Sequence, residues 1–183
     1  MKTRIAVLVS GGGTNLQALL DAQTAGRIPH GEIALVVSKK ECGSQAAFEH
    51  RLQGILELDG IDMIILAGFM SILSENFTKK WPNRILNIHP SLIPAFCGEG
   101  FYGLHVHEAA LSRGVKVTGA TVHFVNEIPD GGPILLQKAV EVLPEDTPET
   151  LQRRVMEQAE WILLPQAAEL VARQIATSPS NTR

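Results

Sequence analysis

The stretch from Ile5 to Asn15 reads IAVLVSGGGTN and decides the class of fold. Its first five residues form an unbroken apolar run, which is typical of a parallel strand covered on both faces. Leucines then recur at helical spacing, and Gly26 marks a stop. The stretch therefore predicts a buried strand, a glycine turn and a helix, the unit from which α/β sheets are built.

The same alternation of strand and helix continues outward from this unit. Repeated alternation of this kind favours a parallel sheet with right-handed crossover connections. Apolar runs predict strands at residues 33–37, 61–66 and 85–88, and helical spacing predicts helices at residues 47–56 and 74–81.

After residue 90 the pattern changes to a glycine-containing loop at 94–103 and a short helix at 105–113. Two further strands, 115–125 and 134–142, and a long amphipathic helix from a start at 146–149 complete the chain. We predict an α/β, Rossmann-like, mostly parallel twisted sheet with helices on both faces and an antiparallel strand pair toward the C-terminal half. One domain should span residues 1–176, and residues 177–183 should form a flexible tail.

Composition narrows the class of protein. The chain has 183 residues, 45% of them hydrophobic, and a formal net charge of -3. Without a basic cluster, nucleic-acid binding is not expected. No apolar stretch approaches the ~20 residues of a membrane span, and no leader precedes the first strand, so we expect a cytoplasmic protein. Cys42 and Cys97 are too few for a disulfide framework and should be free thiols.

A polar pair closes the strand at residues 85–88. Asn87 and His89 are two residues apart, so they project on the same side of an extended strand. Pro90 stops the strand, which places His89 at a carboxyl end, where open α/β sheets bind ligands. The alternative is a strand end whose polar side chains only satisfy nearby loop backbone.

The glycine turn is a candidate anion site. Gly13, Thr14 and Asn15 stand at a helix N-terminus, where backbone amides bind anions. The turn lacks both the GxGxxG spacing of dinucleotide folds and the Gly-Lys-Ser/Thr of phosphate loops. A monophosphate therefore fits better than NAD or ATP, and a plain tight turn is the alternative.

Two further groups of polar residues need an interpretation. Asp130 should lie at the same sheet edge as His89 and raise its pKa, making it a proton donor near neutral pH, unless Asp130 is only a turn former. His105 and His107 diverge on a helix without a third ligand, so no metal site is expected. His123 is interpreted as part of a polar strand face.

Four segments, Val9–Gln17, Leu66–Leu73, Leu86–Pro94 and Asp130–Ile134, together resemble a known family in order and spacing. The family is the phosphoribosylglycinamide formyltransferases, which transfer a formyl group from 10-formyltetrahydrofolate to glycinamide ribonucleotide in purine biosynthesis. The resemblance covers essentially the whole chain. It implies that the folate is a co-substrate, that no metal is needed, and that the protein is a monomer or homodimer without nucleic-acid or membrane partners.

The resemblance also implies roles for individual residues. Asn87 and protonated His89 would stabilise the oxyanion of a tetrahedral intermediate formed by direct attack, and Asp130 would keep His89 cationic. The implied ribonucleotide-binding residues are Gly13, Thr14, Asn15, Leu16, Gln17 and Glu160, the last with a solvated helix face as its alternative. The implied folate-binding residues are Met70, Ser71, Ile72, Leu73 and Asn87.

This chain departs from the family pattern in two places. Ser71 and Gln45 stand where the family usually has arginine. A helix and an edge strand that the family places after the second strand are missing between Ser38 and Glu41. Either the protein has lost an edge element or the sequence omits a stretch.

Three other functions compete with formyl transfer to the ribonucleotide. A 10-formyltetrahydrofolate hydrolase has a similar core but typically adds an N-terminal regulatory domain. A methionyl-tRNA formyltransferase needs a further C-terminal domain and a basic surface. A non-catalytic nucleotide- or folate-binding module would keep the glycine turn but would lose the trio of Asn87, His89 and Asp130.

Overall fold

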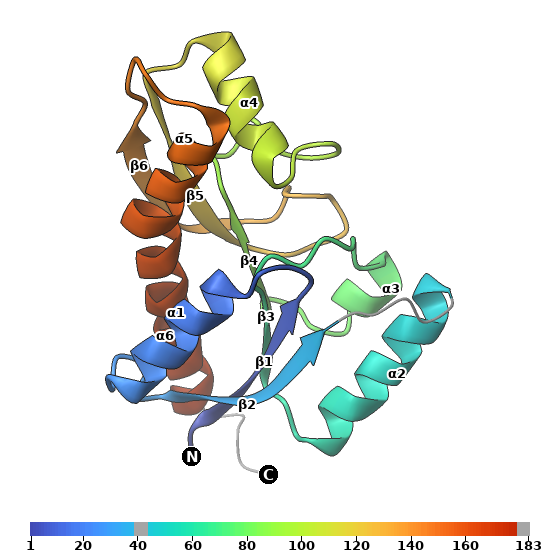
Figure 1. The fold of residues 1–183 in the computed structure, drawn as a ribbon. Helices are drawn as coiled ribbons and strands as arrows, with labels where there is room; N and C mark the ends of the chain where they lie inside the picture. The colour runs from blue at the N-terminus through green and yellow to red at the C-terminus, as the bar shows by residue number, and fades with distance from the viewer. Residues whose placement is uncertain (39–43, 179–183) are drawn as a thin grey trace.

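The computed structural model describes residues 1–38 and 44–178, which form a six-stranded sheet in the order β2-β1-β3-β4-β5-β6 (Figure 1). The first four strands run parallel to one another: β1 (Thr3–Val9), β2 (Gly31–Ser38), β3 (Met63–Leu66) and β4 (Ile85–His89). β5 (Val117–Phe124) is antiparallel to β4, and β6 (Ile134–Glu141) is antiparallel to β5. The predicted fold class is therefore confirmed, with the change of direction at β4.

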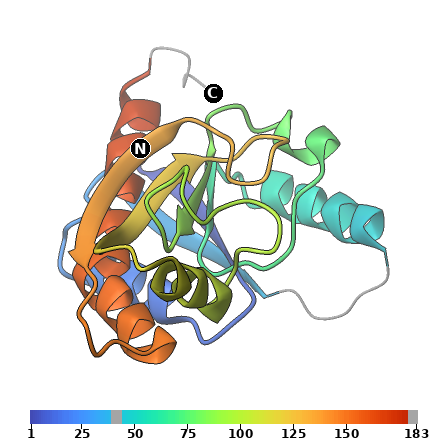
Figure 2. The same ribbon diagram turned by 90° about the horizontal axis from the view of Figure 1, so that it is seen from above.

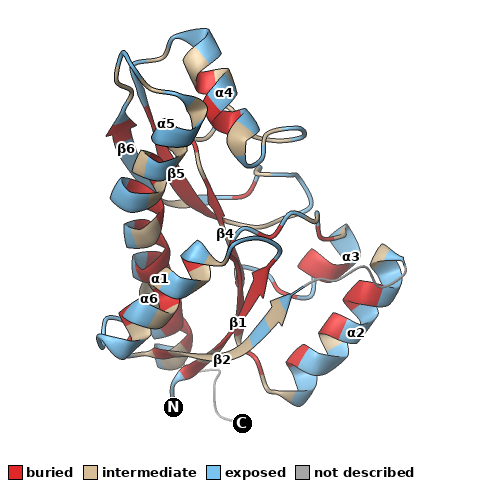
Figure 3. Cartoon of the chain, viewed as in Figure 1, coloured by how far each residue is buried: buried red, intermediate tan, exposed pale blue. Residues whose placement is uncertain are grey.

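Helices cover both faces of the sheet (Figure 2). Ile5 and Val7 of β1 belong to one hydrophobic core, which also contains buried residues of α1 (Thr14–Thr24), α4 (Leu104–Arg113), α5 (Pro148–Val155) and α6 (Trp161–Thr177). Ala6 and Leu8 belong to the other core, with α2 (Gln45–Leu58) and α3 (Glu75–Thr78). Because both faces of β1 are buried (Figure 3), its sequence reads as a continuous apolar run.

The last helix closes the core over the first strand. The Thr3 hydroxyl donates a hydrogen bond of 2.7 Å to the carbonyl of Ala172, across 169 residues of sequence. Thr3 is 2% exposed and Ala172 is fully buried, so this bond lies inside the core. The C-terminal half of α6 is thereby bonded to the start of β1, inside the sheet.

Two predicted helices differ from the structure. The helix predicted at 74–81 is shorter in the structure: α3 ends at Thr78, and the amides of Lys80 and Trp81 bond three residues back, to Phe77 and Thr78, as in turns. The long helix predicted from residue 146 is interrupted by a π-helix, η1 (Met156–Glu160), between α5 and α6. A π-turn adds one residue to a helical turn but changes the spacing of the apolar residues little. The apolar pattern of the sequence therefore did not reveal η1.

The remaining expectations concern the chain as a whole. Cys97 is a free thiol, whereas Cys42 and the gap inferred after Ser38 fall on residues 39–43, outside the described residues. α6 continues to Thr177, one residue into the predicted tail, and residues 179–183 are also outside the description. No helix in residues 1–38 or 44–178 has the length and apolar character needed to cross a membrane.

Candidate active site

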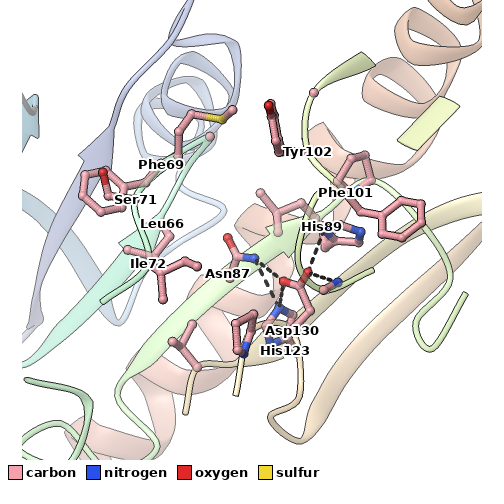
Figure 4. Close-up of a pocket in the computed structure, with 18 of the residues that line it drawn as sticks. Leu66, Phe69, Ser71, Ile72, Asn87, His89, Phe101, Tyr102, His123 and Asp130 are labelled. Atoms are coloured by element: carbon pink, nitrogen blue, oxygen red, sulfur yellow. Dashed lines mark hydrogen bonds and ion pairs between the residues drawn. The ribbon is translucent and has the colours of Figure 1, made fainter. Parts of the chain in front are cut away.

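A cavity of about 490 Å³ opens at the carboxyl ends of β3 and β4, beside the change of strand direction. This is the position where open α/β sheets bind ligands, and the volume suits a small-molecule site. Figure 4 shows a cluster of polar side chains, Asn87, His89, His123 and Asp130, with Leu66, Phe69 and Ile72 on one side and Phe101 and Tyr102 on the other. The cavity therefore has apolar walls around a small polar centre.

β4 supplies the first two polar side chains. Asn87 and His89 both line the cavity, as their two-residue spacing predicts, and β4 ends at His89 before Pro90. In the antiparallel register with β5, Asn87 lies opposite His123. The predicted position of His89 at a carboxyl end of the sheet is confirmed.

Asp130 lies at the centre of the polar cluster. Its Oδ2 atom is 3.5 Å from His89 Nδ1 and accepts a 2.9 Å hydrogen bond from the Gly98 amide. Its Oδ1 atom is 3.4 Å from both the Asn87 amide nitrogen and His123 Nε2. The loop after β5 thus delivers one carboxylate to both strand residues, as predicted.

His123 was interpreted as part of a polar strand face, and it does lie on β5 opposite Asn87, but the sequence did not predict that it lines the cavity. The side chain is 1% exposed, and its Nδ1 donates a 2.9 Å hydrogen bond to the Phe124 carbonyl. In the neutral ring, Nε2 then accepts from the Asn87 amide at 3.2 Å. Pairing β5 against β4 in the sequence would have found this residue, because the register places His123 opposite Asn87.

The prediction that His89 has a raised pKa is also wrong. Burial lowers the pKa of His89, and it outweighs the Asp130 charge and the Phe96 carbonyl, which both raise it. For Asp130 the balance is reversed: burial raises its pKa, but His123, His89 and the Gly98 amide together bring it below its ordinary value. The ligand-free site therefore pairs an ionised carboxylate with an imidazole that binds its proton less tightly than a free histidine does.

A second polar group lies at the other end of the cavity, near the start of α1. Glu160 accepts a 2.7 Å hydrogen bond from the Asn15 side-chain amide, and both residues are buried. Burial raises the pKa of Glu160, against the effect of the Asn15 bond. The Asn15 Oδ1 atom is buried without a hydrogen-bond partner among the described residues. A ligand with a donor group would satisfy it.

Most of the residues assigned to the site from the sequence line this cavity. They are Thr14, Asn15, Met70, Ser71, Ile72, Leu73, Asn87, His89, Asp130 and Glu160. Gly13, Leu16 and Gln17 are not part of its wall. Gly13 is the N-cap of α1, and Gln17 points to Asp21 on the exposed side of that helix.

Gln45 and His107 have positions that the sequence did not predict. Gln45 donates a 3.0 Å hydrogen bond to the Ile72 carbonyl and so supports the loop rather than the cavity wall. His107 is fully buried in the cavity wall, neither of its ring nitrogens bonds to a described residue, and burial lowers its pKa to about 4, with a further contribution from His89. In the described part of the chain, no three His, Cys, Asp or Glu residues could hold a metal ion together.

Comparison with known proteins gives the site a context. Residues 37–167 match the family model for formyl transferases. A phosphoribosylglycinamide formyltransferase from Haemophilus influenzae is 41% identical over 177 residues, which cover 85% of this chain and 81% of that protein. A trifunctional purine biosynthetic protein from Gallus gallus is 44% identical over 193 residues, covering 93% of this chain.

The relatives differ in length from this chain. It spans 18% of the Gallus gallus protein and 61% of a chloroplastic phosphoribosylglycinamide formyltransferase from Arabidopsis thaliana, to which it is 37% identical. The Gallus gallus alignment runs over more positions, 193, than this chain has residues, 183. That relative therefore contains residues without a counterpart here.

Solved structures agree with these sequence matches. Glycinamide ribonucleotide transformylase 1 from Symbiobacterium toebii has a TM-score of 0.85 at 42% identity, covering 94% of this chain and 89% of that one. A formyltetrahydrofolate deformylase from Pseudomonas syringae has a TM-score of 0.86 at 24% identity, which shows a shared fold alone, and covers 95% of this chain and 62% of that one. On the family model and the Haemophilus influenzae match, this chain belongs to the formyl transferase family.

Proposed function

We propose that the protein transfers the formyl group of 10-formyltetrahydrofolate to the amine of glycinamide ribonucleotide in purine biosynthesis. The observation that carries the proposal is the convergence of Asn87, His89 and Asp130 in one cavity of a formyl transferase. Relatives named for this ribonucleotide reaction support the choice of substrates.

In this proposal, Asn87 and His89 activate the formyl group. The formyl carbonyl is the electrophile, and attack by the amine moves its π electrons onto oxygen. Hydrogen-bond donors that meet a developing negative charge in a site shielded from water lower the barrier strongly. The Asn87 amide and protonated His89 supply such donors at the end of β4.

Asp130 and His89 together carry out the proton transfers of the reaction. The attacking amine must lose a proton, and the folate nitrogen must gain one as its bond to the formyl carbon breaks. Asp130 is ionised at neutral pH, so it can accept through a water molecule, and its charge favours the imidazolium form of His89. No covalent enzyme intermediate and no metal ion are needed.

The two ends of the cavity fit the two substrates. Thr14 and Asn15 stand at the α1 N-terminus and suit the phosphate and ribose of the ribonucleotide, together with Glu160. The Asn15 Oδ1 atom, which has no hydrogen-bond partner in residues 1–38 and 44–178, offers an acceptor for a ribose hydroxyl. Met70, Ser71, Ile72 and Leu73 form a mostly apolar wall that suits the flat ring system of the folate.

The decisive experiment measures folate product formation with and without the ribonucleotide. We expect turnover only when both substrates are present. Product formation without the ribonucleotide would indicate a hydrolase instead, and tight ribonucleotide binding without turnover would indicate a binding module.

A further inference from the structure

The loop that follows β4 bonds to both members of the His89–Asp130 pair through its backbone. The Phe96 carbonyl accepts a 2.8 Å hydrogen bond from His89 Nε2, and two residues later the Gly98 amide donates to Asp130 Oδ2 at 2.9 Å. Figure 4 marks the contact between His89 and Asp130 with a dashed line. One short segment, Phe96–Gly98, therefore contacts both ends of the pair.

An unusual backbone conformation makes this double contact possible. Phe96 has a φ of 50° and Gly98 a φ of 88°, so left-handed residues stand on both sides of Cys97. A non-glycine residue such as Phe96 adopts this region at an energetic cost, and such residues cluster at functional sites. Here the bend turns a carbonyl and an amide of the same segment toward the same pair of side chains.

The contact with Phe96 determines which nitrogen of His89 carries a hydrogen in the neutral ring. A carbonyl oxygen can only accept, so Nε2 must be the protonated nitrogen, and Nδ1 is left to exchange a proton. Nδ1 is also the nitrogen that faces Asp130, at 3.5 Å. The other titratable groups around His89 are His123 and His107, which are both buried.

We propose, on the basis of the function proposed above, that Phe96 and Gly98 are positioning residues that make Nδ1 the proton-exchanging atom of His89. The imidazolium gives its Nδ1 proton to the departing folate nitrogen and becomes a neutral imidazole, with Nε2–H still bonded to the Phe96 carbonyl. Nδ1 then regains a proton that originates from the attacking amine and passes by way of Asp130. The Gly98 amide keeps Asp130 beside Nδ1 throughout.

The first test is nitrogen NMR of the ligand-free protein with ¹⁵N-labelled histidine, with His89 assigned by comparison with His89→Gln. We expect the neutral His89 ring to be protonated at Nε2 in a single tautomer. A neutral ring protonated at Nδ1 would overturn the proposal. Because this measurement needs no turnover, its outcome does not depend on whether the proposed reaction is correct.

The second test compares two glycine substitutions of similar conformational cost. Gly98→Ala and Gly114→Ala both place a side chain at a positive φ, 88° and 72°, with open space around the new Cβ. Gly114 is the C-cap of α4, and its amide bonds to the carbonyls of Ala110 and Leu111 in the same helix. Any difference between the variants therefore reports on the contacts of the loop, rather than on backbone strain as such.

For Gly98→Ala we expect kcat to fall by about tenfold or more, the scale of impaired acid–base catalysis, with both KM values changed by less than about threefold. The His89 pKa should fall further, because the Phe96 carbonyl raises it in the parent, and the ring should exchange between tautomers. Gly114→Ala should match the parent in kcat, in both KM values, in the His89 pKa and in the tautomer of the ring. Equal behaviour of the two variants would overturn the positioning role.

Discussion

At the scale of single residues, burial and charge act on His89 in opposite directions, and burial is the stronger. A carboxylate neighbour alone would suggest a histidine that is protonated at neutral pH. The structure instead gives a ring whose proton is held weakly before substrates bind. Such a ring releases its proton readily, which suits a group that must both donate and recover a proton within one turnover.

Replacement of His89 by alanine tests its role directly. His89→Ala should reduce kcat by a factor of at least about 100, the usual scale for a general acid. Ribonucleotide affinity should remain nearly intact, because the proposed ribonucleotide-binding residues are Asn15 and Glu160 rather than His89. Steady-state kinetics and titration calorimetry measure the two quantities. The exposed His50 of α2 provides a control, and His50→Ala should behave as the parent does.

Asp130→Asn should change the pH dependence in a defined direction. The Asp130 charge raises the pKa of His89, so its removal should lower that pKa further. Activity that needs protonated His89 is lost as pH rises through this pKa, and the loss should therefore occur at a lower pH in the variant. The kcat–pH profile and an NMR titration of His89 check this. A His89 pKa that rises in the variant would contradict the proposed coupling.

The sequence could predict some of these residues and not others. Asn87 and His89 were predictable, because a polar pair at the end of an apolar run can be recognised in the sequence alone. His123 was not, since its role depends on the register between two strands. Phe96 and Gly98 contribute only backbone atoms to their contacts, and such contacts cannot be predicted from residue type. The His89 pKa depends on burial, which is a property of the folded molecule.

At the scale of elements, the unit of strand, glycine turn and helix was predictable because β1 is buried on both faces and α1 starts directly after Gly13. The antiparallel pair of β5 and β6 followed from its alternating pattern and the intervening turn formers. The π-helix η1 was not predicted, although it ends at Glu160, a residue of the cavity wall. π-turns are frequent at functional sites, which fits this position.

The start of α5 provides a prediction about stability. Asp146 accepts a 2.6 Å hydrogen bond from Arg154 Nη2 and a 2.8 Å bond from the Leu143 amide. The hydrogen bond with Arg154 is the main cause that lowers the pKa of Asp146 from 3.8 to about 2. Because the folded-state pKa is the lower one, this contribution to stability is present above about pH 4 and is lost as pH falls toward 2.

Asp146→Asn should accordingly reduce the free energy of unfolding at pH 7 by between about 1 and 2 kcal/mol, allowing for solvent screening. The difference from the parent should shrink as pH falls from about 4 to about 2. Urea unfolding at several pH values measures it. Glu157→Gln breaks the exposed ion pair with Arg153 and should leave stability unchanged at every pH. A difference that persists at pH 2 would exclude the ionised carboxylate as its cause.

At the scale of the whole molecule, the sheet has a parallel half and an antiparallel end, and the cavity lies where they meet. The first half was predictable from alternating elements, but the meeting point needs the pairing of β4 with β5. The domain limits of 1–176 and the monomeric or homodimeric state stay predictions. The absence of a helix and an edge strand after Ser38 also stays a prediction, with a lost edge element and an omitted stretch of sequence as its two explanations.

Binding of the ribonucleotide should stabilise the whole fold. A ligand that binds only the folded state at 100 times its Kd adds about 2.7 kcal/mol to the free energy of unfolding. For a domain of this size, that raises Tm by roughly 5 to 10 °C. Differential scanning calorimetry with glycinamide ribonucleotide measures the shift, and ribose without phosphate serves as the control. An unchanged Tm at saturating ribonucleotide would contradict the proposed substrate.

The bond between Thr3 and Ala172 has a consequence for synthesis of the protein on the ribosome. One apolar face of β1 packs in a core that includes α6 (Trp161–Thr177). This core stays incomplete until α6 has left the exit tunnel of the ribosome. Residues as far as Thr177 must therefore be translated before the native core can close, and nascent chains expose Ile5 and Val7 during that time. Chains released early by premature termination before α6 would be substrates for chaperones and proteases rather than shortened enzymes.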